Sequence, residues 1–292
     1  MGVGLRFGPY SLVVERYDRF LSDATLYVVK LEDRVLRELH RAAAEAGRRG
    51  ITVPSVDLDA VGRRTGDRQA AQKAIQRLVR AERVVPVRKD LLVLPDTTGL
   101  LGIDLADLVD AIAPEPYLIT GGRALERYGL SDQHFFGVVV LVSRRVKQLS
   151  YRGQSARFLL TDPAHIWGWE EGVRPQYATP ERAVVDALNH PRYAVSLTQA
   201  LDALLLVASN DSEFMDRLLK TVVRYKSPSA ARRVGLVVER FFGAEAAALY
   251  RPLIGENRSP VLLRPGGAAG GTLDTAWRVV VNAALEPERA SA

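Results

Sequence analysis

Apolar and polar positions alternate at helical spacing in the stretch around residue 70. Four apolar residues stand at i, i+3, i+4 and i+7, which puts them on one side of a helix: Ala71, Ala74, Ile75 and Leu78. The pattern predicts one helix over Asp67 to Arg83, with Asp67 as its N-cap after the turn residue Gly66. The opposite arc carries long hydrogen-bond donors and no carboxylate, at positions Gln69, Gln72, Lys73, Gln76 and Arg80.

The segments on either side of this helix give it a context. Leu31 to Ala46 has apolar residues at helical spacing and predicts a first helix, and Ile51 to Val53 predicts a short strand. Ser55 to Arg64 reads as a short helix with Ser55 as its cap. Val84 to Pro95 holds two short β-rich runs and predicts a hairpin with a basic tip. This order of elements is typical of a winged helix-turn-helix.

The residue types on these elements suit a DNA duplex. Gln and Arg can make paired hydrogen bonds with base edges in the major groove, so we expect the base-reading residues to be Arg68, Gln69, Gln72, Lys73 and Gln76. Cations around the groove neutralise phosphates, which fixes position and not sequence, and here they are Arg63, Arg64, Arg77, Arg80, Arg88 and Lys89. The alternative interpretation is a three-helix core whose outer face is cationic without binding DNA.

The charge distribution favours the DNA interpretation. From Arg48 to Lys89 there are eleven Arg or Lys against four Asp or Glu, a balance of +7 in a chain whose total is +6. Basic excess confined to one module is typical of a polyanion site. A membrane surface fits this module less well, because the basic face carries no Trp, Phe or Leu to insert.

The length of 292 residues and the hydrophobic content of 47% predict two domains. We expect an extension over residues 1–30, the winged module over residues 31–96, and a larger mixed α/β domain over residues 103–292, with Asp96 to Gly102 as the hinge. The fold class is α+β. Residues 1–30 are compatible with a strand, a short helix or a dimer-forming arm.

The second domain shows clear element signals. A strand at Gly137 to Ser143 is followed by a predicted hairpin whose turn holds Arg144 and Arg145. Thr179 and Pro180 mark one helix start, and Ser196 begins a capping-box pattern. Two basic clusters are candidate contacts with a partner or with DNA beside the winged module, against the alternative of solvated surface: Arg144, Arg145 and Lys147, and Arg232 and Arg233 with their neighbours Arg224 and Lys226.

Catalytic and cofactor chemistry is not indicated. The chain has no cysteine, and its four histidines lack metal-ligand spacing, so we expect no metal, no cofactor and no enzyme activity. Asp104, Asp107 and Asp110 share one helical side and are interpreted as a solvated acidic face. Trp167 and Trp169 are interpreted as core or as a contact patch. No apolar run is long enough for a membrane span, and the start lacks a secretory signal, which together favour a cytoplasmic protein.

Several segments together resemble a known family. They are the winged module ending in RLVRAERVVPVRKDLLVLP, the segment PYLITGGRALERYGLSDQ, and the strings YATPERAVVDAL and ARRVGLVVE. From about Leu31 onward the chain resembles the AbiEi family of antitoxins and transcriptional regulators. The first thirty residues and the GRRGITVPSVD connection depart from the family pattern. The resemblance implies binding to inverted repeats in the chain's own promoter, repression of its operon, and antagonism of a nucleotidyltransferase-type toxin.

The expected function is therefore a cytoplasmic, DNA-binding transcriptional autorepressor and antitoxin. Its expected partners are double-stranded operator DNA with repeats, a toxin encoded alongside, and a second copy of the chain on DNA. An alternative is a nucleic-acid-processing enzyme that the winged module delivers to DNA. A third possibility is a protein–protein adaptor whose winged fold binds a partner.

Overall fold

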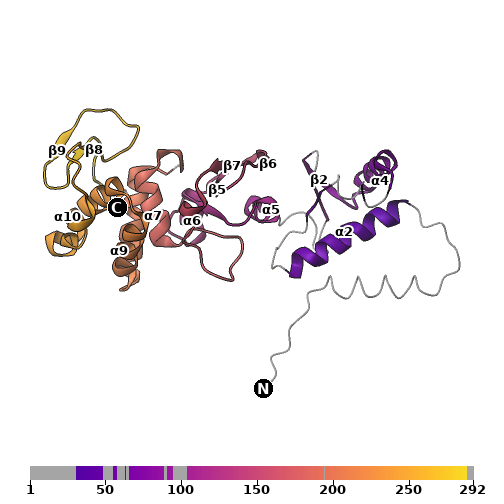
Figure 1. The fold of residues 1–292 in the computed structure, drawn as a ribbon, viewed down its shortest axis with the longest axis horizontal. Coiled ribbons are helices and arrows are strands. Elements are labelled where there is room, and N and C mark those ends of the chain that lie inside the picture. Colours follow the sequence, from indigo (N-terminus) through magenta and orange to yellow (C-terminus); the bar gives the residue numbers. More distant parts are fainter. Residues whose placement is uncertain are drawn as a thin grey trace, which may run out of the picture. The chain divides into compact units, whose positions relative to one another are not determined.

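The computed structural model describes residues 31–48, 55–57, 63, 66–88, 91–94, 104–193 and 195–287. Contacts divide the chain into two compact units: Met1–Ala113 with Leu149–Ser155, and Pro114–Gln148 with Ala156–Ala292. Figure 1 shows both and labels those helices and strands for which there is room. The predicted extension over residues 1–30 and the predicted hinge at Asp96 to Gly102 lie outside the described residues.

The described part of the first unit includes the helices α2, α4 and α5 and a small sheet. Its elements in chain order are α2 (Leu31–Arg48), β1 (Ser55–Asp57), α4 (Arg68–Arg80), β2 (Val85–Arg88), β3 (Leu91–Val93) and α5 (Leu105–Ile112). The strands form an antiparallel sheet in the order β1-β3-β2. The predicted hairpin is confirmed as β2 and β3. The prediction that Ser55 caps a helix is wrong, because Ser55–Asp57 pairs with β3 as a strand.

One apolar cluster holds α2, α4 and the hairpin together. Val35, Leu36 and Leu39 of α2 are buried against the inner side of α4. That inner side is the four-residue stripe predicted from periodicity, and Val84, Leu92 and Leu94 extend the cluster to the strands. The stripe is confirmed as the buried side of α4. Its burial fixes which side of α4 faces outward.

Helix α4 ends earlier than its sequence predicts. The last helical residue is Arg80, and Glu82 adopts a left-handed conformation with φ of 54°. The backbone N–H of Arg83 then donates to the carbonyl of Leu78 at 2.9 Å, a C-terminal capping pattern. This turn directs the chain into the core at Val84, which is 1% exposed, so the helix ends at Arg80 instead of the predicted Arg83.

The acidic residues of α5 do not form a solvated face. Asp104 and Asp107 make a reciprocal capping box at the start of the helix. Asp110 is only 1% exposed. The expectation of a solvated acidic face is therefore wrong, because two of the carboxylates satisfy backbone N–H groups and the third faces the interior.

The second unit combines two sheets with a group of helices. A four-stranded sheet has the order β4-β5-β7-β6, with β4 at Tyr117–Thr120, β5 at Gly137–Val142, β6 at Leu149–Tyr151 and β7 at Gln154–Leu160. The β6 strand and the first two residues of β7 belong to the segment grouped with the first unit. The strand predicted at Gly137 is confirmed.

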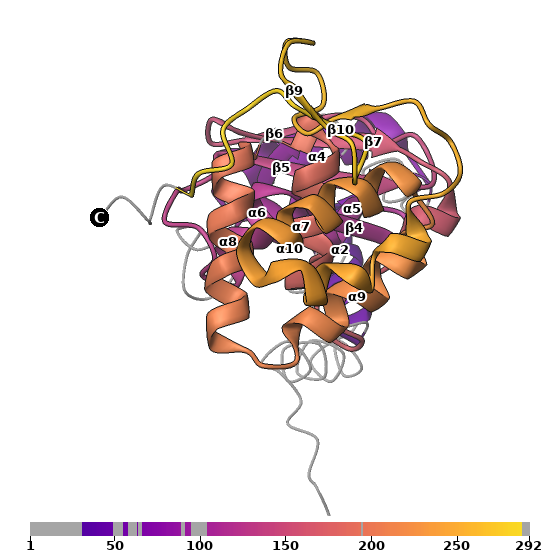
Figure 2. The same cartoon turned by 90° about the vertical axis from the view of Figure 1, so that its left-hand side faces the viewer.

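The remaining elements of the second unit follow in order. They are α6 (Gly122–Arg127), a 3₁₀ turn at Pro163–His165, α7 (Pro180–Asn189), a 3₁₀ turn at Pro191–Tyr193, α8 (Leu197–Asn210), α9 (Phe214–Tyr225), α10 (Pro228–Ala248), a 3₁₀ turn at Arg251–Leu253, β8 (Val261–Leu262), β9 (Thr272–Asp274) and β10 (Val279–Val281). Helix α7 contacts α6, α8, α9 and α10, and Figure 2 shows α8 to its left, α9 to its lower right and α10 crossing in front of it. The fold class is mixed α+β, as predicted.

Two helix starts in this unit can be compared with their predictions. Ser196 and Gln199 form the predicted capping box of α8, with the Ser196 Oγ accepting from the Gln199 N–H at 3.1 Å. Thr179 is the N-cap residue of α7, with Pro180 at the first turn, but the Thr179 side chain makes no capping hydrogen bond. The predicted position is correct, and the Thr179 carbonyl accepts the first hydrogen bond of the helix from the Ala183 N–H at 2.8 Å.

The predicted turn at Arg144 and Arg145 is wrong. Strand β7 lies between β5 and β6, so the segment that follows β5 passes to a strand that is not its neighbour. The tight turn is at Arg152 and Gly153, both with positive φ, between β6 and β7. The sequence pattern predicted that the strand after β5 lies next to β5 in the sheet. In the structure β7 is the neighbour of β5, and β6 lies on the far side of β7.

Helix α10 contains a glycine in close contact with a buried ring. A Cβ placed on Gly235 would lie 2.1 Å from Cζ3 of Trp277, whose side chain is completely buried. The indole N–H of Trp277 donates to Glu239, one turn further along the same helix. Gly235 therefore lets the segment before β10 dock against α10.

Gly235→Ala should reverse the usual effect of this substitution. Gly to Ala in a helix interior ordinarily stabilises by about 1 kcal/mol, but the new methyl group would displace Trp277, and we expect a loss of about 1–3 kcal/mol. Urea unfolding followed by tryptophan fluorescence measures it. The matched control is Gly270→Ala, where a Cβ meets nothing within 4 Å. A stabilised Gly235→Ala variant would contradict the close contact.

Candidate nucleic-acid interface

The outward side of α4 presents long polar side chains in a continuous group. All seven of its polar residues are exposed: Arg68, Gln69, Gln72, Lys73, Gln76, Arg77 and Arg80. The helix contains no acidic residue. Its N-cap carboxylate, Asp67, accepts a hydrogen bond from the Ala70 N–H at 3.0 Å and so caps the helix. We call these seven residues the α4 face.

One residue of the α4 face is paired with the neighbouring helix. The Arg77 guanidinium forms an ion pair with Glu32 at the start of α2. Both side chains are partly exposed, so the pair contributes little to stability. It does reduce the positive charge on the side of α4 that faces α2. Sequence spacing could not reveal this pair, because Glu32 and Arg77 are far apart in the chain.

The other predicted phosphate contacts are placed unevenly. Arg80 ends α4, and Arg63 is an exposed helical residue before it. Arg88 is the last residue of β2. Arg64 and Lys89 lie outside the described residues. Among the residues described, the structure therefore brings Arg68, Arg77 and Arg80 together with the amides of α4.

The first secondary basic cluster is on the surface. Arg144, Arg145 and Lys147 are all exposed in the segment between β5 and β6. They are accessible, as expected, although they do not form a hairpin tip. Their role as contacts with a partner or with DNA stays a prediction.

The second basic cluster is divided: Arg232 is buried and Arg233 is partly buried, whereas Arg224 and Lys226 are exposed. Arg232 is 2% exposed and donates to the carbonyls of Ile254, Ser259 and Asn257. Arg233 donates to the Leu262 carbonyl and, at 2.6 Å, to the Asn189 side chain, and burial lowers its pKa to about 10. The expectation of accessibility is wrong for Arg232 and Arg233, because both guanidinium groups tie α10 to the chain that follows it.

Helix α7 carries a buried ion pair that the sequence did not identify. Asp186 is completely buried, and its Oδ2 accepts from Arg182 Nε at 3.0 Å and from Thr120 Oγ1 at 2.7 Å. Its Oδ1 accepts from the Tyr225 hydroxyl at 2.7 Å. That hydroxyl has one proton to donate, so the His190 Nε2, 2.8 Å away, must donate to it. We call these five residues the Asp186 network.

Aromatic rings enclose the cationic side of the Asp186 network. The Arg182 guanidinium lies 4.2 Å from the centroid of the Trp167 ring, and Arg224 lies 4.4 Å from the same ring. Trp167 is 7% exposed, which confirms the core interpretation for that residue. Burial, followed by the charge of Asp186, holds the pKa of Tyr225 above its usual range, so Tyr225 stays a neutral donor.

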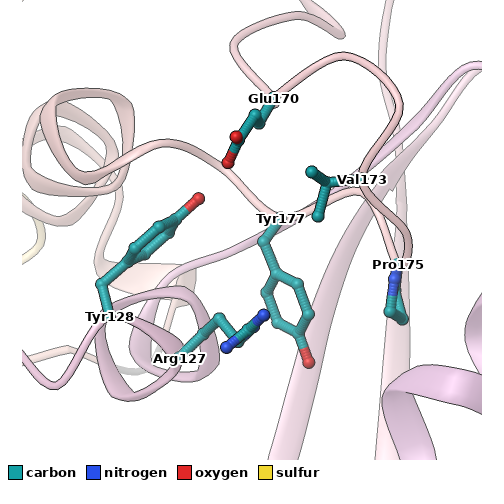
Figure 3. Close-up of a pocket in the computed structure, with 6 residues that line it drawn as sticks. All are labelled: Arg127, Tyr128, Glu170, Val173, Pro175 and Tyr177. Atoms are coloured by element: carbon teal, nitrogen blue, oxygen red, sulfur yellow. The ribbon is translucent and has the colours of Figure 1, made fainter. Parts of the chain in front are cut away.

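A pocket in the second unit is shown in Figure 3. It has a volume of about 360 Å³ including the part open to solvent, and its lining is Arg127, Tyr128, Glu170, Val173, Pro175 and Tyr177. The Tyr128 hydroxyl and the Glu170 carboxylate point toward one another. Burial and then the Glu170 charge raise the pKa of Tyr128. The lining has no nucleophile beside a general base, so it does not by itself indicate a catalytic site.

The described residues contain neither a metal-binding cluster nor a membrane-spanning helix. Within the described ranges, His, Asp and Glu residues form no cluster of three or more suited to a metal ion. No described helix combines the length and the apolar character required to cross a bilayer.

Comparison with known proteins gives one structural likeness. No protein-family model matches the chain, and no curated protein matches it. A crystal structure of the RV2827C protein from Mycobacterium tuberculosis is similar over 88% of this chain and 93% of that chain, with a TM-score of 0.50 and 14% sequence identity. This likeness concerns the fold alone.

Removing the carboxylate at the centre of the Asp186 network should strongly destabilise the second unit. Asp186→Ala leaves the Arg182 guanidinium buried without its counter-charge, which we expect to cost about 3–5 kcal/mol. Denaturant unfolding of the full chain measures the loss. The matched control is Asp216→Ala, which removes an exposed helical carboxylate and should cost below about 1 kcal/mol. Equal effects of the two variants would refute a structural role for the network.

Proposed function

We propose that this protein is a DNA-binding transcriptional autorepressor that acts in the cytoplasm, with α4 as its recognition helix. The observation that carries the proposal is the α4 face, seven exposed polar side chains on a helix without a carboxylate. An ordinary solvated helix mixes charges of both signs. Cations suit the phosphates of a duplex, and amides suit base edges, so both kinds of contact are available on one surface.

The arrangement of elements supports a winged helix-turn-helix for this module. Helix α4 follows the strand β1 and precedes the β2–β3 hairpin, and the sheet order β1-β3-β2 puts the hairpin strands beside that earlier strand. Gly66, with φ of 82°, provides the turn before Asp67. In such modules the second helix of the motif lies in the major groove, while the hairpin and the flanking cations contact the backbone.

Burial supports a rigid presentation of the α4 face. Ala71, Ala74 and Leu78 are at most 2% exposed, so the helix cannot rotate about its axis without exposing its apolar side. The exposed side chains are therefore held in a fixed direction by packing. A recognition surface on a regular element positions its contacts more precisely than a loop would.

The regulatory part of the proposal rests on the resemblance to AbiEi antitoxins. The resemblance supports binding to inverted repeats. A dimer suits such repeats, because one module buries too little surface for tight specific binding. The resemblance also supports antagonism of a nucleotidyltransferase-type toxin by the second unit. In that unit Arg144, Arg145 and Lys147 are the exposed cations for a partner or for DNA, and Arg232 and Arg233 are withdrawn from that role.

The double variant Lys73→Ala/Gln76→Ala should erase preference for the operator. We expect its affinity for duplex fragments from the chain's own upstream region to fall to the weak level seen on unrelated duplexes, because base contacts carry the sequence preference. Fluorescence anisotropy at a fixed salt concentration measures both affinities. Lys220→Ala, which removes an exposed lysine from α9, is the control for lost charge. A variant that keeps full preference would show that α4 is misassigned.

The dependence of binding on salt should report on phosphate contacts. Arg80→Ala should reduce the slope of log K against log salt by about one unit, if the guanidinium displaces one counterion. Glu32→Gln should increase the slope, because it releases Arg77 from its ion pair and leaves that guanidinium available to phosphate. Titrations between low and moderate salt measure both slopes. Unchanged slopes in both variants would place the phosphate backbone away from this side of α4.

A further inference from the structure

The central part of the α4 face is built mainly from primary amides. Gln69, Gln72 and Gln76 are exposed together with Lys73, the one ammonium group on this helix. At about 100° per residue these four side chains lie within an arc about 100° wide. Along the axis, Gln69 and Gln76 are separated by about 10 Å, at about 1.5 Å per residue. That distance matches about three base-pair steps of roughly 3.4 Å each.

The chemistry of the amide selects among the bases. A glutamine side chain has both a donor and an acceptor, and adenine presents one acceptor, N7, beside one donor, N6, in the major groove. Guanine presents two acceptors there and suits Lys or Arg, which only donate. Cytosine presents a donor and suits a carboxylate, and α4 has no acidic residue. The three amides therefore match adenine better than the other bases.

Resting on the proposed function, we infer that α4 reads an adenine-rich half-site. Within three to four consecutive base pairs, the glutamines hydrogen-bond to adenines through N6 and N7, and Lys73 hydrogen-bonds to a guanine among them. The ligand is thus a duplex whose major-groove edge presents alternating donors and acceptors at the positions facing Gln69, Gln72 and Gln76.

The neutral amides argue against a face that serves only to attract phosphate. Glutamine carries no charge, so it releases no counterion and adds little to binding that ignores sequence. A surface of that kind would carry Lys or Arg at the centre of the arc. Here three amides occupy the arc over most of its length, and Lys73 and, at the C-terminal end of the helix, Arg80 are the cations within it. The guanidinium groups of Arg68 and Arg77 lie to either side, at about 80–100° from Gln69 around the helix.

Selection from a random duplex pool with the full chain tests the inference. We expect each recovered half-site to contain three adenines and a guanine within about four base pairs. Fluorescence anisotropy then compares the recovered duplex with copies in which one adenine is replaced by 7-deazaadenine, which lacks the N7 acceptor. We expect roughly 5- to 100-fold weaker binding at each position that a glutamine reads.

The variant Gln72→Met assigns one of these positions. Methionine keeps the length and helix propensity of glutamine without its hydrogen bonds, so one of the 7-deaza substitutions should lose its effect in this variant. Gln148→Met, at an exposed position in the second unit, should keep every penalty of the wild-type chain. This comparison uses folded protein in each case and separates lost base contact from lost stability.

Two results would overturn the inference while leaving the proposed function standing. They are specific binding to half-sites without adenine, and specific binding that 7-deazaadenine does not weaken at any position. Failure to bind any duplex at low salt would instead refute the proposed function, and the inference with it. The two kinds of failure are therefore distinguishable in the same titrations.

Discussion

The burial of one side of α4 against α2 is the constraint on which the proposed interface depends. Two of the buried positions are alanines, Ala71 and Ala74, whose small side chains let the two helices approach closely. Ile75 and Leu78 belong to the same buried cluster, which also includes Leu92 of the hairpin. With these four positions facing inward, the helical period leaves the amides and cations facing outward. The α4 face is thus the necessary counterpart of the core contact.

The centre of the second unit contains a buried ion pair on helix α7. Helix α7 is surrounded by other helices, so the charged pair Arg182 and Asp186, one turn apart, has no access to bulk water. Thr120 and Tyr225 supply the remaining donors to the carboxylate. A buried pair of this kind stabilises only when its hydrogen bonds are satisfied. Both carboxylate oxygens of Asp186 accept hydrogen bonds, while Nη1 of Arg182 has no hydrogen-bond partner in the described part of the chain. The most distinctive string in the sequence, YATPERAVVDAL, is therefore explained by internal structure and not by an exposed site.

Local patterns in the sequence predicted helices and their caps well. They could not predict contacts between residues that are far apart in the chain. The stripe on α4, its cap at Asp67 and the capping box at Ser196 follow from spacing within a few residues. The position of β7 between β5 and β6 does not, because spacing along the chain does not encode strand order. The same limit applies to the guanidinium of Arg232, whose acceptors lie more than twenty residues away. The sequence showed a basic cluster there, while tertiary contacts withdrew Arg232 and Arg233 from the surface.

Under the proposed function, the distribution of charge on α4 separates two tasks of the proposed interface. Position on a duplex requires cations at the edges of the contact, where phosphates lie, and sequence reading requires hydrogen-bonding groups at its centre. Arg68 and Arg77 lie on the flanks of the helix, and Arg80 lies at its end. The Glu32 carboxylate then lowers the effective charge on one flank through its pair with Arg77. Weaker attraction to phosphate at an edge reduces binding to every sequence alike, so a larger share of the affinity comes from the amides at the centre.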